Sequence, residues 1–388
     1  METYDVVIVG AGLAGLQASR LLAENDLRVL LVDRKPSVSQ SVHTTGIFVR
    51  RTLEDFPLPA DCLGPAVRDV TLYSPARRRL ELHSHYDEFR VGRMALLYER
   101  FLEHAIRAGV EWMPGTQFLD ARRMTHYSLL ILKHREARIY AATRYLVGAD
   151  GARSRVASAL QLDENREWIV GVEEVLEHVP LAGRPRFHCF LDPRLAPGYL
   201  AWAVHEGEQV HVGVGGYPQR FDPIAALTQF RAGLGAIIDL SGARVIEKRG
   251  GRIPVGGVLR HLANRSGLLL GDAAGAVSPL TAGGLDPCLR LSQYAAQVIT
   301  EYLRDGKREV LTAYSGDLFR ARFVSRLWMR RLIRTIRSQE LMEIGCAMMR
   351  LPLLNSFAHH IFFGRGSFPD PNPTLRTTAA HSASALRF

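Results

Sequence analysis

Short apolar runs and one helical repeat dominate the start of the chain. Residues 4–10 form an apolar run rich in β-branched side chains, which predicts a buried parallel strand. Residues 13–24 repeat apolar side chains at helical spacing, and residues 27–32 form a second apolar run. This strand–helix–strand order predicts a βαβ unit with both strands in one parallel sheet.

The turn between the first strand and the helix has the pattern GxGxxG. Gly10 permits the tight turn, Gly12 lets the backbone approach a pyrophosphate, and Gly15 lets helix and strand pack closely. The first helical residues, Leu13 and Ala14, present amide hydrogens and the positive end of the helix dipole to phosphates. The turn therefore predicts a Rossmann-like dinucleotide-binding site.

An acidic residue follows the second strand. Asp33 is placed to accept hydrogen bonds from ribose hydroxyls of the dinucleotide. Arg34 and Lys35 come next, and two interpretations remain open for them. They could bind a 2′-phosphate and so favour NADP, or they could form a solvated edge. We include Arg34 among the candidate cofactor-binding residues.

Two later strands each end in an acidic residue beside a glycine. Residues 145–150 end in Asp150, and residues 268–272 end in Gly271-Asp272. Two such ends suit one extended dinucleotide, with Asp272 placed against a ribityl chain or a pyrophosphate. A helix follows to about residue 303, and its first amides could stabilise negative charge on a reduced flavin ring. The cofactor-binding candidates in these motifs are Asp150, Gly271, Asp272, Pro279, Gly283, Gly284 and Leu285.

The order of these motifs resembles the FAD-dependent oxidoreductases of the glutathione-reductase-2 type, over roughly residues 1–305. That group includes aromatic hydroxylases, geranylgeranyl reductases and flavin halogenases. Residues 250–257 and 271–284 resemble the geranylgeranyl reductase branch most. The resemblance implies FAD as cofactor. It also implies that Thr45 and Gly46 lie in a flavin-contacting loop and that Arg93 lies near the FAD pyrophosphate.

The chain departs from that branch at two places. Its reductases often have a Tyr-x-Trp-x-Phe-Pro motif in the substrate cavity, and only Trp202 of this motif is present here. Some of them have a cysteine in the loop after the second strand, and residues 42–46 contain none. Both departures concern the isoprenoid substrate and leave the FAD assignment unchanged.

The pattern predicts an α/β (α+β) fold in which a β-sheet substrate domain is inserted into a Rossmann-like FAD-binding domain. The FAD-binding domain would comprise residues 1–70, 91–165 and 244–305, with a β-meander from residue 117 to residue 141. The remaining segments are the substrate domain at 71–90 and 166–243, a C-terminal helical region at 306–363, and a disordered tail at 364–388.

The C-terminal region has a basic amphipathic pattern. Apolar residues recur at helical spacing between residues 319 and 336. An opposing stripe consists of Arg322, Arg326, Arg330 and Arg334. Two interpretations remain open: a helix lying on an anionic membrane surface, or a helix that covers the core with its arginines in water.

Composition narrows the class without choosing a ligand. The net charge is +10, which allows attraction to anionic lipids or substrates, and 47% of the residues are hydrophobic, as in globular proteins. We expect no metal site, because the four cysteines are scattered. We also expect no nucleic-acid partner, no signal peptide and no membrane span. These expectations suggest a cytoplasmic protein, either free in the cytoplasm or bound peripherally to the inner face of a membrane. The oligomeric state is left open.

Three kinds of flavin chemistry fit the sequence. The first is reduction of C=C bonds in an apolar, prenyl-like substrate by hydride from reduced FAD, with NADPH or NADH as electron donor. The second is monooxygenase or, with less support, halogenase chemistry through a flavin–oxygen adduct. The third is electron transfer or non-catalytic flavin binding. The candidate catalytic residues are His43, Trp202, His205 and Cys288.

Overall fold

The computed structural model describes residues 2–180 and 183–364, and it confirms the predicted α/β class. The strands are β1 (Glu2–Val9), β2 (Val29–Val32), β3 (Ile47–Val49), β4 (Leu63–Val67), β5 (Asp69–Tyr73), β6 (Arg79–His83), β7 (Phe89–Gly92), β8 (Glu111–Met113), β9 (Thr116–Arg123), β10 (Ser128–His134), β11 (Ala137–Gly148), β12 (Trp168–Glu177), β13 (Arg186–Phe190), β14 (Ala201–His205), β15 (Gln209–Gly216), β16 (Arg244–Pro254), β17 (Ala263–Asn264) and β18 (Gly267–Leu269). The helices are α1 (Leu13–Ala23), α2 (Arg50–Asp55), α3 (Met94–Arg107), α4 (Arg155–Leu160), α5 (Pro223–Leu234), α6 (Leu285–Asp305), α7 (Glu309–Ala313), α8 (Gly316–Ala321), α9 (Val324–Thr335), α10 (Gln339–Met348) and α11 (Pro352–Phe363), with short 3₁₀ turns η1 (Ala60–Cys62) and η2 (Gly271–Ala274).

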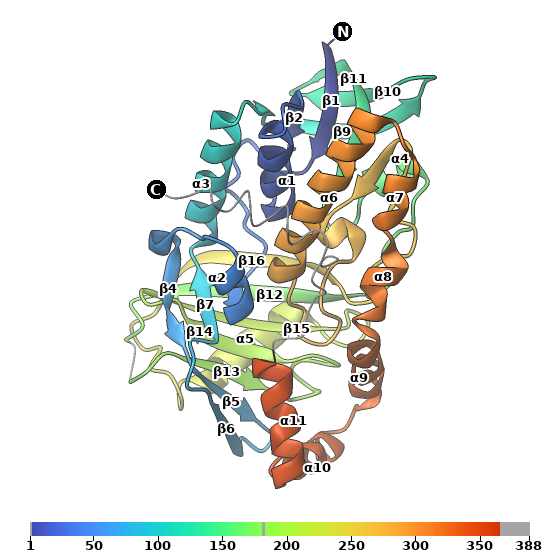
Figure 1. Ribbon diagram of the computed structural model, residues 1–388. Helices are drawn as coiled ribbons and strands as arrows, with labels where there is room; N and C mark the ends of the chain where they lie inside the picture. The colour runs from blue at the N-terminus through green and yellow to red at the C-terminus, as the bar shows by residue number, and fades with distance from the viewer. Residues whose placement is uncertain (1, 181–182, 365–388) are drawn as a thin grey trace.

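The first sheet is built on the βαβ unit. Strand β1 lies parallel to both β2 and β11, and β11 lies parallel to β18. Helices α1, α3 and α6 pack together beside this sheet (Figure 1). The apolar side chains of β1, β2 and α1 are almost completely buried, which explains why the two apolar runs form central strands. Strand β11 continues past residue 141, where the predicted meander ends, because its first half pairs with β10 and its second half pairs with β1.

The second sheet lies below the first in Figure 1 and has seven strands in the order β16-β12-β15-β14-β13-β5-β6. Helix α5 packs on one of its faces. Strand β16 pairs along its whole length with β12, so residues 244–254 belong to this sheet rather than to the first. The division into an FAD-binding domain and a substrate domain stays a prediction, and residues 244–254 now belong to the substrate domain. Strands β3, β7 and β4 form a small third sheet.

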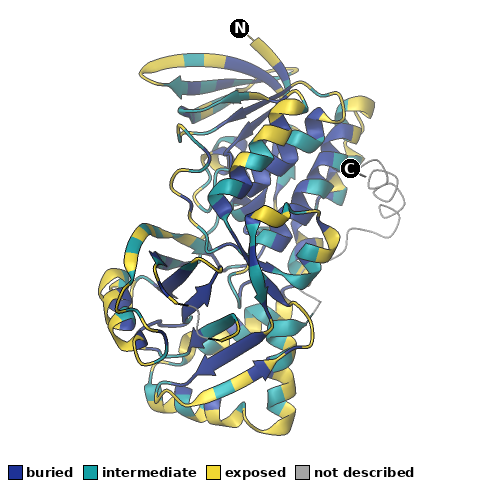
Figure 2. Cartoon of the chain, turned by 90° about the vertical axis from the view of Figure 1, so that its left-hand side faces the viewer, coloured by how far each residue is buried: buried dark blue, intermediate teal, exposed yellow. Residues whose placement is uncertain are grey.

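The C-terminal helices differ from the predicted pattern. The repeat between residues 319 and 336 is divided between α8 and α9. Arg330 is only 2% exposed, so the interpretation that places this arginine in water is wrong. The apolar residues Val324, Trp328 and Leu332 of α9 are 48%, 64% and 65% exposed. Figure 2 shows exposed residues on the outer helices and also on outer strands, around buried central strands. The predicted tail lies outside the described residues, except for Gly364.

Candidate flavin site and a buried polar cluster

The glycine-rich turn leaves a space in front of α1. Gly10 has a φ of +104°, and a Cβ at Gly15 would lie 1.9 Å from the Gly10 carbonyl oxygen. A Cβ at Gly12 would meet nothing within 4 Å. No side chain caps the N-terminus of α1, so the amide hydrogens of Leu13 and Ala14 face this space without a side-chain acceptor. These features fit the pyrophosphate of a dinucleotide.

The acidic residue after β2 stabilises the same turn. Asp33 Oδ2 accepts a hydrogen bond from the Ala11 amide at 2.7 Å, and Oδ1 accepts one from the Lys35 amide at 2.8 Å. Each carboxylate oxygen has two lone pairs, so Asp33 retains acceptor capacity for ribose hydroxyls. Arg34 beside it is exposed and lines a neighbouring cavity.

Asp150 has a structural role in this fold. Its carboxylate accepts hydrogen bonds from the Ser154 hydroxyl at 2.6 Å and from the Arg155 and Val156 amides at 2.7 and 3.2 Å. These bonds satisfy the first amides of α4. Burial raises the pKa of Asp150, and the hydrogen bonds oppose that shift. The residue therefore shapes the rim of the site, and direct cofactor binding by Asp150 stays a prediction.

Asp272 and the start of α6 face each other without partners of their own. Burial raises the pKa of Asp272 to about 6, and no described residue donates a hydrogen bond to its carboxylate. A Cβ at Gly284, the residue before Leu285, would lie 3.5 Å from Asp272 Oδ1, and no side chain caps α6. An isolated acceptor beside free helix amides fits a ligand that has both hydroxyl donors and an electron-rich edge. FAD has both.

The loop before α6 is held in place from two directions. The Ser278 amide donates to the Gly283 carbonyl at 3.0 Å, across the turn that contains Pro279. Arg326 of α9 donates to the Ser278 hydroxyl at 2.9 Å. Helix α9, which the sequence places outside the FAD-binding region, therefore supports the candidate cofactor loop.

The Thr44–Gly46 loop borders the same site. A Cβ at Gly46, whose φ is +85°, would lie 2.9 Å from the Met94 sulfur of α3. One turn further along α3, burial raises the pKa of Tyr98. The neighbouring Cys288 and Asp272 raise this pKa further, and Arg249 opposes the shift. Thr52 of α2, just after β3, donates a hydrogen bond to Asp286 at the start of α6 at 2.8 Å, and β3 packs against α6, so the loop, α3 and the start of α6 are neighbours. Thr45 therefore lies close to the place where Asp272 and Gly284 face each other.

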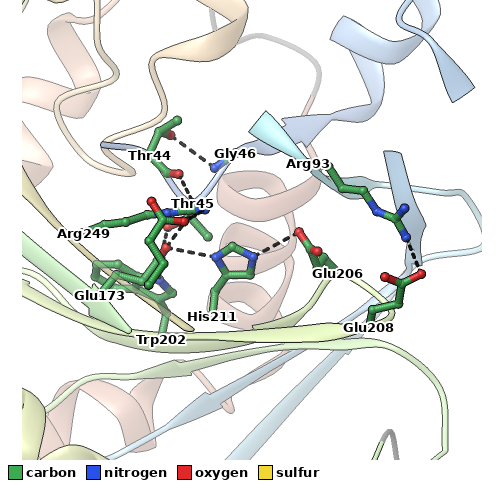
Figure 3. A network of polar contacts seen from close by, with 11 residues as sticks. Thr44, Thr45, Gly46, Arg93, Glu173, Trp202, Glu206, Glu208, His211 and Arg249 are labelled. Carbon is green, nitrogen blue, oxygen red and sulfur yellow. Dashed lines mark hydrogen bonds and ion pairs between the residues drawn. The ribbon is translucent and has the colours of Figure 1, made fainter. Parts of the chain in front are cut away.

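A buried polar cluster lies directly beneath this loop (Figure 3). Glu173 of β12 accepts hydrogen bonds from the Thr45 hydroxyl and from the Trp202 indole, the latter at 2.9 Å. His211 of β15 lies between two carboxylates, 2.9 Å from Glu173 and 3.2 Å from Glu206. We call Glu173, Glu206, His211 and Arg249 the Glu173 cluster.

The Glu173 cluster contains opposite charges. Burial alone would lower the pKa of His211, but the two neighbouring carboxylates raise it to about 9. Burial alone would raise the pKa of Glu173, but His211, Thr45 and Arg249 lower it. Arg249 also donates to the Thr44 carbonyl at 2.9 Å and to Glu247 at 2.6 Å. At neutral pH His211 is therefore an imidazolium that holds one proton on each ring nitrogen, beneath the loop of Thr45.

Of the four candidate catalytic residues, the structure brings only Trp202 into contact with the Glu173 cluster, through its hydrogen bond to Glu173. Because side chains alternate along a strand, His205 of β14 points to the opposite face of the sheet from Trp202. Burial lowers the pKa of His205 to about 4. Cys288 lies in α6 near Asp272, and burial raises the pKa of its thiol, so it stays protonated. His43 is exposed in a separate cavity.

Arg93 lies at the start of α3, where its side chain forms an ion pair with Glu208 at 2.9 Å. Both side chains are partly exposed, and Figure 3 shows that they lie on the side of Glu206 that faces away from the Thr44–Gly46 loop. The Nε atom of Arg93 is buried and has no partner among the described residues. The predicted contact with the FAD pyrophosphate stays a prediction.

Sequence reasoning missed the charged members of the cluster. A signal was present in β12, where Ile169, Gly171, Glu173 and Val175 occupy the buried positions of the strand alternation. A glutamate in such a register predicts a buried partner. The partner itself, His211, comes from the neighbouring strand and could not be identified without the pairing of β12 with β15.

Comparison with known proteins places the chain in a family. The sequence profile of the FAD binding domain family matches residues 3–330. The chain is 25% identical over 320 residues to a digeranylgeranylglycerophospholipid reductase of Methanocaldococcus jannaschii, covering 81% of each chain.

Solved structures share the fold. The chain matches a geranylgeranyl bacteriochlorophyll reductase-like protein of Thermoplasma acidophilum with a TM-score of 0.80 and 20% identity, covering 88% of this chain and 90% of that one. It also matches p-nitrophenol 4-monooxygenase of Pseudomonas putida with a TM-score of 0.69 and 18% identity, covering 94% and 95%.

The protein belongs to the FAD binding domain family. Within that family it is an FAD-dependent oxidoreductase similar to the geranylgeranyl reductases. Among the residues that the structure describes, no helix combines the length and apolar character that crossing a membrane requires.

Proposed function

We propose that the protein reduces C=C bonds of an apolar, prenyl-like substrate. The observation that supports this proposal most is the similarity to digeranylgeranylglycerophospholipid reductases over about four-fifths of the chain, 81%. The position of the Glu173 cluster beside Trp202 and the Thr45 loop agrees with it. Bound FAD supplies the hydride when reduced.

The chain's own residues would enclose the substrate and hold a proton. Gly213 and Gly215 leave room for the rings of Trp202 and Tyr199, because a Cβ at either glycine would lie within 3 Å of the ring above it. These rings offer an apolar wall on the sheet face opposite α5. Each hydride added to a C=C bond requires one proton on the other carbon, and His211 holds a proton within two hydrogen bonds of Thr45. Glu173 orients both groups.

We also propose NADPH or NADH as the electron donor, since a flavin that reduces substrate must itself be reduced. A stopped-flow comparison of the two nucleotides tests this under anaerobic conditions. Flavin bleaching by either one supports the proposal. Bleaching only by a reduced ferredoxin or a quinol contradicts it.

The reductase proposal is tested by the mass of the product. FAD-loaded protein, reduced without oxygen by dithionite, is mixed with a geranylgeranyl lipid, and the lipid is analysed by mass spectrometry. The gain of two hydrogens per reduced double bond is the expected result. A product that gains an oxygen atom, formed from an aromatic substrate only when air is admitted, would favour the monooxygenase alternative instead.

We further propose that the protein works at a membrane surface, to which the outer faces of α9, α10 and α11 bind. Ile344 of α10 and Leu353 of α11 are 57% and 88% exposed, and apolar residues of α9 are exposed as well. Exposed arginines such as Arg331 and Arg350 border this face, and the chain has a net charge of +10. An apolar face with a basic border suits an anionic bilayer.

Vesicle flotation tests this contact. We expect binding to phosphatidylglycerol vesicles that falls at least fivefold in Trp328→Ser/Leu332→Ser. The matched control is Tyr140→Ser on β11, which removes an exposed side chain, 53%, from the first sheet at the other end of the molecule (Figure 1). Equal loss in both variants, or no flotation of the native protein, would overturn the proposal.

A further inference from the structure

Arg326 of α9 reaches the loop that precedes α6. Its guanidinium Nη1 donates a hydrogen bond to the Ser278 hydroxyl at 2.9 Å. The side chain is half-buried, and no carboxylate of the described residues lies within 4.0 Å of its guanidinium nitrogens. Arg334, further along α9, pairs instead with Glu167 at 3.2 Å. Because buried charges are normally paired, Arg326 points to an anion that the described part of the chain does not supply.

The Ser278 hydroxyl is the centre of a hydrogen-bonded loop. It also accepts a hydrogen bond from the Thr281 hydroxyl at 2.9 Å, and the Ser278 carbonyl accepts one from the Ala282 amide at 2.9 Å. Ala282 has a φ of +54°, a left-handed conformation that is unfavourable for a residue with a side chain. The bonds to Ser278 hold Ala282 in this conformation. Arg326 therefore helps to fix residues 278–284, which we call the 278–284 loop.

Helix α9 also holds the 278–284 loop through a second arginine. Arg330 donates to the Gly198 carbonyl at 2.8 Å, and its guanidinium carbon lies 5.3 Å from the centre of the Tyr199 ring. The Tyr199 hydroxyl in turn donates to the Thr281 carbonyl at 2.8 Å. The loop is thus attached to α9 at two places, so the charge of Arg326 keeps a fixed position relative to the loop.

The charge of Arg326 reaches the start of α6. Burial lowers the pKa of Arg326, and the carboxylate of Asp286, in the first turn of α6, opposes that shift. Asp286 is already paired with Arg290 at 2.9 Å. The positive charge of Arg326 can therefore act on a ligand at Gly284 and the first amides of α6, where no side chain caps the helix.

We propose that Arg326 is a positioning residue for the flavin, and that its charge stabilises the reduced form of bound FAD. Two electrons and one proton from the reductant, dithionite in the experiment below, convert the neutral oxidised ring into a reduced ring with one negative charge. The first amides of α6 favour that charge, and the guanidinium of Arg326 adds to their effect. The oxidised ring has no such charge, so Arg326 favours the reduced form over the oxidised form.

The reduction potential of FAD bound to the full-length protein tests the role of this charge. The protein is reduced stepwise with dithionite, without oxygen and beside a reference dye. We expect Arg326→Gln to lower the equilibrium constant for reduction at least tenfold, which is about 30 mV for a two-electron couple. Arg326→Lys keeps the charge, and we expect less than a threefold change. Arg322→Gln is the matched control with less than a twofold change, because it removes the same charge from an exposed side chain.

The affinities for the two forms of FAD separate this role from a structural one. Calorimetry should show that Arg326→Gln binds oxidised FAD within threefold of the native protein, because glutamine can still donate to the Ser278 hydroxyl. Weaker binding of both forms by the same factor would leave the potential unchanged, and that result would overturn the proposal. A shift in Arg322→Gln as large as the shift in Arg326→Gln would also overturn it.

Ser278→Ala decides the question if Arg326→Gln does not fold or does not hold FAD. It removes only the hydroxyl that orients Arg326, and we expect the equilibrium constant for reduction to fall at least threefold. An unchanged potential in this variant would contradict the proposal. No substrate is present in any of these measurements, so their outcome does not depend on whether the protein proves to be a reductase.

Discussion

Replacing Glu173 by glutamine removes the carboxylate on which the buried cluster depends. Glu173 is 4% exposed, lies 2.9 Å from His211, and accepts the Trp202 indole hydrogen at 2.9 Å. Removing one partner of a buried ion pair costs about 3–5 kcal/mol, because the other charge is left without compensation. We therefore expect Glu173→Gln to lower the free energy of unfolding by about 3 kcal/mol at pH 7.

The pH dependence gives a second, independent magnitude. The pKa of His211 is raised from the ordinary 6.5 to about 9, so its protonation stabilises the folded state fully below pH 6.5. That contribution is lost as the pH rises through 9. Linkage gives about 2–3 kcal/mol at pH 7 and almost nothing at pH 10. Glu173→Gln removes most of this contribution, so its cost shrinks to about 1 kcal/mol at pH 10.

Urea unfolding followed by circular dichroism at both pH values measures these differences. Glu208→Gln is the control, because Glu208 is 73% exposed and pairs with Arg93, and we expect a cost of at most about 1 kcal/mol. If Glu173→Gln does not fold, nitrogen NMR of the native protein gives the pKa of His211 directly. A cost that is equal at pH 7 and pH 10, or a His211 midpoint near 6.5, would refute the reasoning.

Three further outcomes follow from single sites. Gly12→Asp should keep the fold, because nothing lies within 4 Å of the added Cβ, and should weaken FAD binding at least tenfold by calorimetry; native affinity would show that the phosphates lie elsewhere. Asp272→Ala removes a carboxylate that no described residue satisfies, so FAD should bind about 10–100-fold more weakly, as expected for a charged hydrogen bond. Burial lowers the pKa of His205 to about 4, which means that the neutral form is favoured in the fold and that stability is lost as the pH falls from 6.5 towards 4. The free energy of unfolding should then be about 2 kcal/mol lower at pH 5 than at pH 7.5, and His205→Gln should remove this difference. Thermal unfolding at the two pH values measures it.

Local patterns predicted the dinucleotide turn because its requirements are local. The position of Gly15 is set by the contact of α1 with the preceding turn, where a Cβ would lie 1.9 Å from the Gly10 carbonyl. Such a steric limit acts within a few residues of the chain. The predicted β-meander also has near neighbours in sequence, and β9, β10 and β11 form it as consecutive antiparallel strands.

The Glu173 cluster depends on contacts between distant segments. Glu173, Thr45, His211 and Arg249 come from β12, the loop before β3, β15 and β16. Each residue alone resembles an ordinary polar position in its own segment. Only the order of the strands in the second sheet brings them together, and the sequence alone predicts that order poorly, because β5 and β16 join this sheet from outside its central segment.

Helix α9 shows why a periodic pattern does not determine which face is buried. Two stripes run along it, and apolar burial favours turning the stripe of Trp328 and Leu332 inward. Arg330 is instead buried, because the Gly198 carbonyl accepts its proton at 2.8 Å and the rings of Tyr199 and Tyr217 lie 5.3 and 5.2 Å from its guanidinium carbon. Cation–π contacts with desolvated rings offset part of the cost of burying that charge. The stripe of Val324, Trp328 and Leu332 is left exposed, whereas Phe323 and Leu327 pack in the core. The exposed stripe is unfavourable in water unless another apolar phase covers it, which is the role we propose for the membrane.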